Sequence, residues 1–90
     1  MIERVAAYRR LSATLRDRSE KLAALITLEM GKTIAAARGE VEKCAATLDW
    51  IADNGPAILA DEPVAVEGGD AVHVSYLPIG TVLAVMPCWR

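Results

Sequence analysis

The stretch that decides the fold is residues 80–90, which read GTVLAVMPCWR. Val82 to Met86 form a continuous apolar run, and Gly80 and Pro87 bound it. Such a run, without polar alternation, is typical of a strand that is buried on both faces in a parallel sheet. The sequence therefore predicts a strand at about 81–86. Parallel neighbours need crossover connections of about a dozen residues or more, and only Pro87 to Arg90 follow the run. We therefore expect either the N-terminal piece of a larger α/β protein or a chain that depends on a partner.

The composition is that of a globular protein. The chain has 90 residues, of which 53% are hydrophobic and 24% are charged, and its net charge is −2. These values exclude a disordered chain. No block of lysine and arginine is present, so we expect no nucleic-acid or anionic-membrane partner. No apolar run reaches the roughly 18 residues of a membrane span, and the N-terminus lacks a signal-peptide pattern. We therefore expect a cytoplasmic protein.

Three amphipathic helices are predicted within residues 3–54. The first covers about 3–15, where helical spacing places one stripe of residues on the buried side: Val5, Tyr8, Leu11, Ser12 and Leu15. Asp17 and Glu20 fit a capping box at the start of the second helix. We expect that helix to end at Gly31, because glycine adopts the left-handed conformation after a helix without steric cost.

The third helix is predicted over Thr33 to Asn54. Its buried stripe is expected to hold Ile34, Ala37, Val41, Cys44, Leu48 and Ile51. Gly39 inside it should cost roughly 1 kcal/mol relative to alanine, so we expect another element to pack closely there. The run from Asn54 to Pro56 is a strong helix stop and predicts the end of the helix.

After the helices the hydrophobic period changes from 3.6 to 2, which predicts a β-hairpin at about 63–77. Val64 and Val66 alternate with polar or small neighbours, residues 67–70 read EGGD and form the turn, and residues 72–76 read VHVSY. His73 alternates with Val72 and Val74, so we expect it to face solvent or an interface.

Few residues could carry chemistry. Cys88 follows the predicted strand, and ligands bind at the carboxyl ends of strands in open α/β sheets, so its thiol is a candidate nucleophile. However, nothing places a base beside it, and a cysteine without catalytic function is the favoured interpretation. Cys44 is interpreted as a buried structural cysteine. Glu40 and Glu42 are interpreted as a solvated helix face, and no zinc site is expected from two cysteines and one histidine.

Four separated motifs, in this order, resemble the N-terminal region of NAD(P)-dependent aldehyde dehydrogenases. They are residues 28–32 (LEMGK), 37–41 (ARGEV), 76–80 (YLPIG) and 85–87 (VMP). The details, including residues 55–66, are most similar to the succinate-semialdehyde dehydrogenase branch. The resemblance covers about residues 4–87.

The resemblance implies an α/β fold, of which residues 1–90 are an incomplete N-terminal part. The helices would pack on the cofactor-binding domain, the hairpin would belong to the oligomerisation domain, and residues 81–86 would be the first strand of a Rossmann-like sheet. Val85, Met86 and Pro87 would then lie beside NAD or NADP and are the candidate cofactor contacts. Binding of the cofactor by these 90 residues alone is not expected.

The resemblance breaks after Pro87. Cys88 stands where the family has tryptophan, and Trp89 stands where it has a catalytic asparagine. The family's nucleophilic cysteine, general-base glutamate and glycine-rich cofactor turn lie further along, so Cys88 is not that nucleophile. The break suggests a truncation, a frameshift or a misassembled reading frame.

The family is one of oxidoreductases, which oxidise an aldehyde to a carboxylic acid through a cysteine thioester, and succinate semialdehyde is the substrate that this branch implies. The chain alone is predicted to be inactive. The alternatives are a non-catalytic interaction module that pairs with full-length dehydrogenase subunits, and a pseudogene product that folds poorly.

Overall fold

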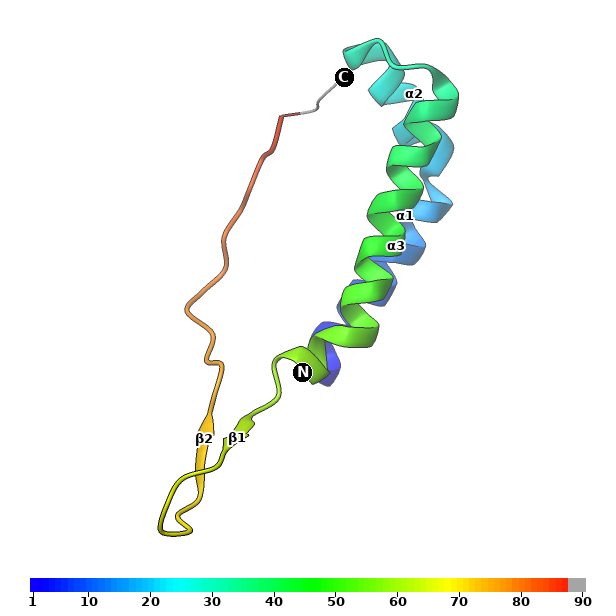
Figure 1. Ribbon diagram of the computed structural model, residues 1–90. Coiled ribbons are helices and arrows are strands. Elements are labelled where there is room, and N and C mark those ends of the chain that lie inside the picture. The colour runs from blue at the N-terminus through cyan, green and yellow to red at the C-terminus, as the bar shows by residue number, and fades with distance from the viewer. Residues whose placement is uncertain (88–90) are drawn as a thin grey trace.

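The chain begins with three helices and continues into a hairpin and an extended segment (Figure 1). The computed structural model describes residues 1–87. The helices are α1 (Ile2–Asp17), α2 (Ser19–Met30) and α3 (Ile34–Ile58), and the strands are β1 (Glu62–Val64) and β2 (Val72–Val74). The three predicted helices and the hairpin are therefore confirmed.

Helix α3 runs antiparallel to α1 and α2 and packs against both of them (Figure 1). Its 25 residues rise about 37 Å at 1.5 Å per residue. Helices α1 and α2 have 16 and 12 residues and follow one another along the chain. Together they are about as long as α3, so the single long helix packs along the length of the two shorter ones.

The junction between α1 and α2 differs from the predicted capping box. Only Arg18 separates the two helices, and no side chain caps the start of α2. The Arg18 amide bonds back to Thr14, while the amide of Leu22 already bonds to Arg18. Because no loop opens at this point, the Asp17 carboxylate has no free helix start to cap.

The junction between α2 and α3 agrees with the prediction. Gly31 has a φ of 71°, and its amide bonds to the Thr27 carbonyl. Two residues later, the Thr33 hydroxyl accepts a hydrogen bond from the amide of Ala36 at 3.2 Å and caps α3. A left-handed glycine followed by a threonine cap produces the tight reversal that makes α3 antiparallel to α2.

The core between the helices consists of small side chains. The buried residues are Ser12, Ala23, Ala37, Val41, Ala45 and Ala52. Leu15, Leu22 and Ile26 pack against the part of this core around Val41. Alanine at the contact allows helix backbones to approach closely, so the helices pack tightly without large apolar side chains.

The predicted stripe on α3 was partly wrong. Ala37 and Val41 are buried, but Cys44 is exposed and its neighbour Ala45 is fully buried. Adjacent positions differ by 100° around a helix axis, and both residues are apolar, so the pattern alone did not separate them. The partner helices select the smaller residue for the contact.

Two further expectations for α3 were wrong. The helix does not stop at Asn54 but continues through Pro56 to Ile58. Proline has no amide hydrogen, so the Ala52 carbonyl loses its helical donor, and the helix ends within a turn of Pro56. Gly39 does not pack against another element, because a β-carbon built on it would meet no atom within 4 Å.

The hairpin has shorter strands than predicted. Glu62 pairs with Val74, Pro63 with His73 and Val64 with Val72 in antiparallel register. Gly68 and Gly69 supply the positive φ angles of 95° and 74° at the turn. Every residue of both strands is exposed.

Residues 77–87 are extended and exposed, and the structure shows no strand at 81–86. Within residues 1–87 no other segment lies beside this stretch to pair with its backbone. Figure 1 shows the segment returning from the hairpin apart from the helices. The Cα radius of gyration is 18.7 Å, whereas a closed domain of about 100 residues has about 13 Å. The Rossmann-like strand therefore stays a prediction.

Candidate functional site

The candidate cofactor contacts lie on the extended segment. Val85 is 86% exposed and Met86 is 78% exposed, and Pro87 is also exposed. Within the described residues 1–87 none of the hydrogen bonds or ion pairs involves these three residues. Their assignment as NAD or NADP contacts therefore stays a prediction.

The other candidates do not form a site. Cys88 lies outside the described residues, so the structure does not place it. Cys44 is exposed on α3 and borders a shallow hollow with Lys43 and Thr47. The imidazole of His73 is half-exposed and lies 3.6 Å from the Asp61 carboxylate. Its exposure agrees with the predicted solvent-facing position.

No group of three or more histidine, cysteine, aspartate or glutamate side chains is placed to hold a metal ion within residues 1–87. None of the helices described there is long and apolar enough to cross a bilayer.

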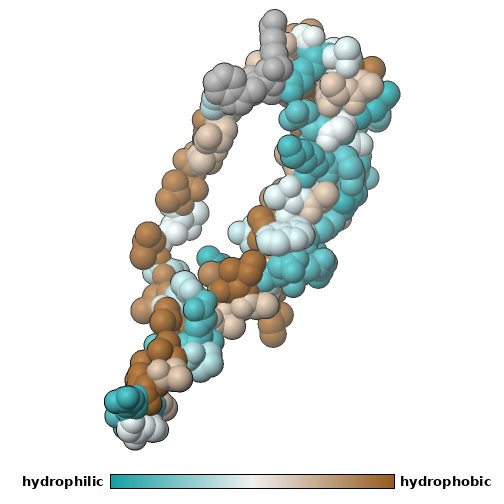
Figure 2. Space-filling view, viewed as in Figure 1, coloured by the Kyte–Doolittle hydropathy of each residue, from teal (hydrophilic) through white to brown (hydrophobic). Residues whose placement is uncertain are grey.

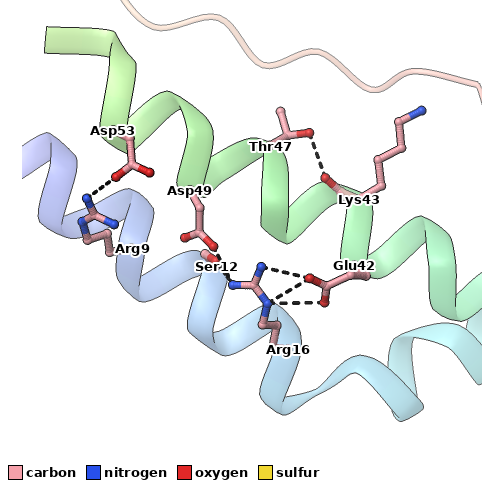
Figure 3. A network of polar contacts seen from close by, with 8 residues as sticks. All are labelled: Arg9, Ser12, Arg16, Glu42, Lys43, Thr47, Asp49 and Asp53. Carbon is pink, nitrogen blue, oxygen red and sulfur yellow. Dashed lines mark hydrogen bonds and ion pairs between the residues drawn. The ribbon is translucent and has the colours of Figure 1, made fainter. Parts of the chain in front are cut away.

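The main polar feature is a set of arginine–carboxylate contacts between the helices (Figure 3). The Arg16 guanidinium on α1 lies between Glu42 and Asp49 of α3. It donates to Glu42 at 3.0 Å and to Asp49 at 2.6 Å. The same guanidinium donates to the hydroxyl of the buried Ser12 at 2.7 Å and so satisfies it.

Similar contacts continue along both ends of α3. Arg9 donates to Asp53 at 2.5 Å, and Arg38 donates to Glu20 of α2 at 2.8 Å. Lys32 pairs with Glu40 at 3.0 Å. The Arg9 and Arg38 contacts join α3 to α1 and α2, whereas Lys32 joins the α2–α3 junction to α3; most of these side chains are partly exposed.

The charges around these carboxylates do not suit them for acid–base catalysis. Hydrogen bonds from Arg16 and Ser12 lower the pKa of Asp49. Arg38 lowers the pKa of Glu20, and Lys32 lowers that of Glu40. A general acid or base that works near neutral pH needs a raised carboxyl pKa. The predicted solvated face of α3 is therefore more accurately a set of ion pairs, which are structural.

The sequence reasoning missed these contacts. One signal was present: Ser12 stood on the apolar stripe of α1, with Arg16 one turn later on the same face. A polar residue on a buried stripe needs a partner. The register of α3 against α1 decides which carboxylates face Arg16. That register could not be predicted from the sequence.

The fold and the motif order agree with the comparison with known families. The chain matches the aldehyde dehydrogenase family over residues 1–89. It therefore belongs to the aldehyde dehydrogenase family.

The relatives narrow the resemblance to one branch. The chain is 50% identical over 84 residues to the succinate semialdehyde dehydrogenase (NAD(P)+) Sad of Escherichia coli K12, covering 93% of this chain and 18% of that protein. It is 48% identical over 75 residues to succinate-semialdehyde dehydrogenase (NADP(+)) 1 of Mycobacterium tuberculosis H37Rv, covering 81% of this chain and 16% of that protein. A Deinococcus radiodurans succinate-semialdehyde dehydrogenase (NADP(+)) is 39% identical over 85 residues, 94% of this chain and 18% of its own length. The chain thus spans less than a fifth of these curated relatives.

Proposed function

We propose that this chain supplies the N-terminal part of a succinate-semialdehyde dehydrogenase, which oxidises the aldehyde to succinate with NAD+ or NADP+. The observation that carries the proposal is the 50% identity to the Escherichia coli enzyme over 84 residues. The enzymes named as relatives use NAD(P)+ or NADP+, so the same cofactors are proposed for the whole protein.

The role of this part is structural support of the cofactor site. The helices would cover one face of a Rossmann-like sheet, and residues 81–86 would be its first strand. Val85, Met86 and Pro87 at the end of that strand would contact the cofactor. The exposure of the strand residues in the chain alone supports this role, because a central strand buries its side chains only when neighbouring strands and helices cover them.

The chemistry proposed for the whole protein needs residues outside this stretch. A cysteine thiolate attacks the aldehyde, a hydride passes to the nicotinamide, and water hydrolyses the thioester. Within residues 1–87 the cysteine, Cys44, shares a hollow with Glu40. The Glu40 carboxylate is paired with Lys32 and its pKa is lowered, so it is poorly suited to take a proton from the thiol. We therefore expect the purified 90-residue chain to show no turnover of succinate semialdehyde above a buffer control.

A chimera tests the proposal directly. Residues 4–87 of this chain replace the matching stretch of the Escherichia coli relative, and reduced nicotinamide is followed by its absorbance with succinate semialdehyde as substrate. We expect a soluble chimera that oxidises the aldehyde. A soluble chimera of native size and cofactor affinity without activity would contradict the proposal.

Two variants of the chimera test whether residues 81–86 form a buried strand, one within the predicted strand and one control outside it. Val82→Asp places a charge where the intact sheet would bury an apolar side chain, so it should abolish soluble, active chimera. Glu67→Asp at the exposed hairpin turn should leave the activity unchanged. If both variants behave alike, residues 81–86 do not act as a buried strand.

One observation favours a second candidate function, a non-catalytic module that pairs with full-length dehydrogenase subunits. Residues 82–86 present an apolar stretch without a backbone partner in the described chain, and such an edge can pair with another chain. Co-expression of the 90-residue chain with the full-length Escherichia coli relative tests it. Co-purification that is lost in Val82→Asp would support the module, and a separate monomer would refute it.

A further inference from the structure

A small apolar pocket lies between the start of α1 and the end of α3. Its volume is about 110 Å³, and it is lined by Met1, Arg4, Val5, Tyr8, Ile51, Gly55, Pro56 and Leu59. The lining is mostly apolar, and the pocket opens at the end of the helix pair. This volume is somewhat smaller than the cavity of about 150 Å³ that holds a benzene molecule, so one branched aliphatic side chain would fill it.

A second hollow adjoins this pocket and extends it toward the segment after the hairpin. The two share Met1, Arg4 and Leu59 as walls. The far wall of the second hollow is formed by Tyr76, Leu77, Pro78 and Gly80. The YLPIG motif therefore passes the mouth of the apolar pocket.

Leu77 is placed to enter the pocket. Its side chain lines the adjoining hollow and is 80% exposed, so moving it inward removes apolar surface from water. Within residues 1–87 no backbone hydrogen bond involves residues 77–87. The move would therefore break no backbone contact of the described chain.

Both ends of the motif favour such a move. The Tyr76 hydroxyl donates to Glu62 of β1 at 2.8 Å, which anchors one end to the hairpin. Gly80 has a φ of 132°, a conformation open to glycine that lets the chain change direction. Pro78 restricts the backbone between the two.

We propose that residues 76–80 form a strap that docks on the end of the α1–α3 pair, with the Leu77 side chain in the pocket beside Tyr8. Docking fixes where residues 81–87 leave the helices. The strap thereby orients the segment that carries Val85, Met86 and Pro87. The proposal does not depend on the enzymatic activity proposed above.

Nuclear magnetic resonance of the 90-residue chain with labelled methyl groups tests the strap. We expect a nuclear Overhauser effect between the Leu77 methyl groups and the Tyr8 ring, together with an upfield shift of those methyl signals by the ring current. In Leu77→Ser the Tyr8 and Val5 signals should move. The matched control is Ile79→Ser, because Ile79 is fully exposed and lines neither hollow; it should leave those signals in place.

Three results would overturn the strap. The first is a set of Leu77 methyl signals at unfolded-chain positions without the contact to Tyr8. The second is an equal change of the Tyr8 signals in Leu77→Ser and Ile79→Ser. The third is a contact that appears only between labelled and unlabelled molecules in an isotope-filtered spectrum, which would place Leu77 of a second copy in the pocket.

Discussion

Residues 2–58 bury some of their apolar side chains, whereas residues 59–87 bury none. The helical region buries small ones, with Ala23, Ala37 and Ala45 fully inaccessible. The second region exposes large ones: Val82, Leu83 and Val85 are each more than 85% exposed. Figure 2 shows the contrast as a brown extended segment beside helices with much teal on their surface. Hydrophobicity alone therefore does not decide burial; a nearby partner does.

The difference follows from how each kind of element satisfies its backbone. A helix bonds its own amides and carbonyls within four residues, and short connections let α3 fold back on α1 and α2. A strand needs a neighbour about 4.8 Å away, and parallel neighbours come only after a long crossover. Residues 81–86 find no such neighbour within residues 1–87.

The largest expected effect tests the helical core. Ala45 is fully buried, so Ala45→Asp places a charge without a partner between the helices. We expect the free energy of unfolding to decrease by on the order of 3 kcal/mol or more. Urea unfolding monitored by circular dichroism measures this decrease. Ala46→Asp changes the exposed neighbour and should have little effect; equal losses would show that α3 is not packed as described.

The second-largest expected effect is a loss of stability of the helical region at low pH. The pKa values of Glu20, Glu40 and Asp49 are lowered in the folded chain, so their contribution is complete above the ordinary carboxyl pKa of about 4. It is lost as the pH falls through the lowered folded values. The urea concentration at which half of the protein is unfolded should therefore decrease as the pH is lowered from about 5 to about 2. Arg38→Gln removes the cause of the Glu20 shift and should flatten this decline; an unchanged slope would contradict the Arg38–Glu20 contact.

Two glycines of the helical region should respond in opposite directions. Gly39→Ala adds a methyl group that meets no atom, so we expect it to stabilise α3 by about 1 kcal/mol. Gly31 has a φ of 71°, in the left-handed region that a residue with a β-carbon adopts only at a steric cost. Gly31→Ala should therefore destabilise the folded chain by roughly 1–2 kcal/mol. Thermal unfolding measures both. Destabilisation by Gly39→Ala would mean that Gly39 is covered by a contact absent from residues 1–87.

The hairpin should weaken in alkali, unlike the helices. The bond to Glu62 raises the pKa of Tyr76, so its contribution is complete below the ordinary tyrosine pKa of about 10 and is lost as the pH rises through the folded value. Ultraviolet titration in a Tyr8→Phe background should show Tyr76 ionising at a higher pH than in Glu62→Gln. Coincident titrations would rule out the bond.

The smallest expected effect tests the extended segment. Val82 is 86% exposed, so Val82→Asp in the 90-residue chain should change the free energy of unfolding by less than about 0.5 kcal/mol. The contrast with the chimera, where the same change should abolish activity, separates a segment that awaits its partner from one that has no buried role. A loss similar to that of Ala45→Asp would show that residues 81–86 already pack in this chain.

Much of the fold was predictable because its signals are local. The three helices, the glycine at the end of α2 and the hairpin turn each depend on residues that are close in sequence. The failures were contacts between elements. Cys44 and Ala45 are both apolar, so the pattern did not show which of them is buried. Asp17 fitted a capping box, but only Arg18 separates α1 from α2 and no side chain caps α2. The candidate cofactor contacts rest on the family resemblance and not on any geometry of residues 1–87.

The sequence by itself determined the three helices and the hairpin, up to Val74, and, through the order of its motifs, the aldehyde dehydrogenase family. Only the tertiary structure decided which face of α3 is buried, which carboxylates Arg16 binds, and that GTVLAVMP remains uncovered among the described residues. The physical reason is range. Helical periodicity, glycine conformation and turn chemistry act over a few residues, whereas helix register and strand pairing depend on partners that lie far along the chain.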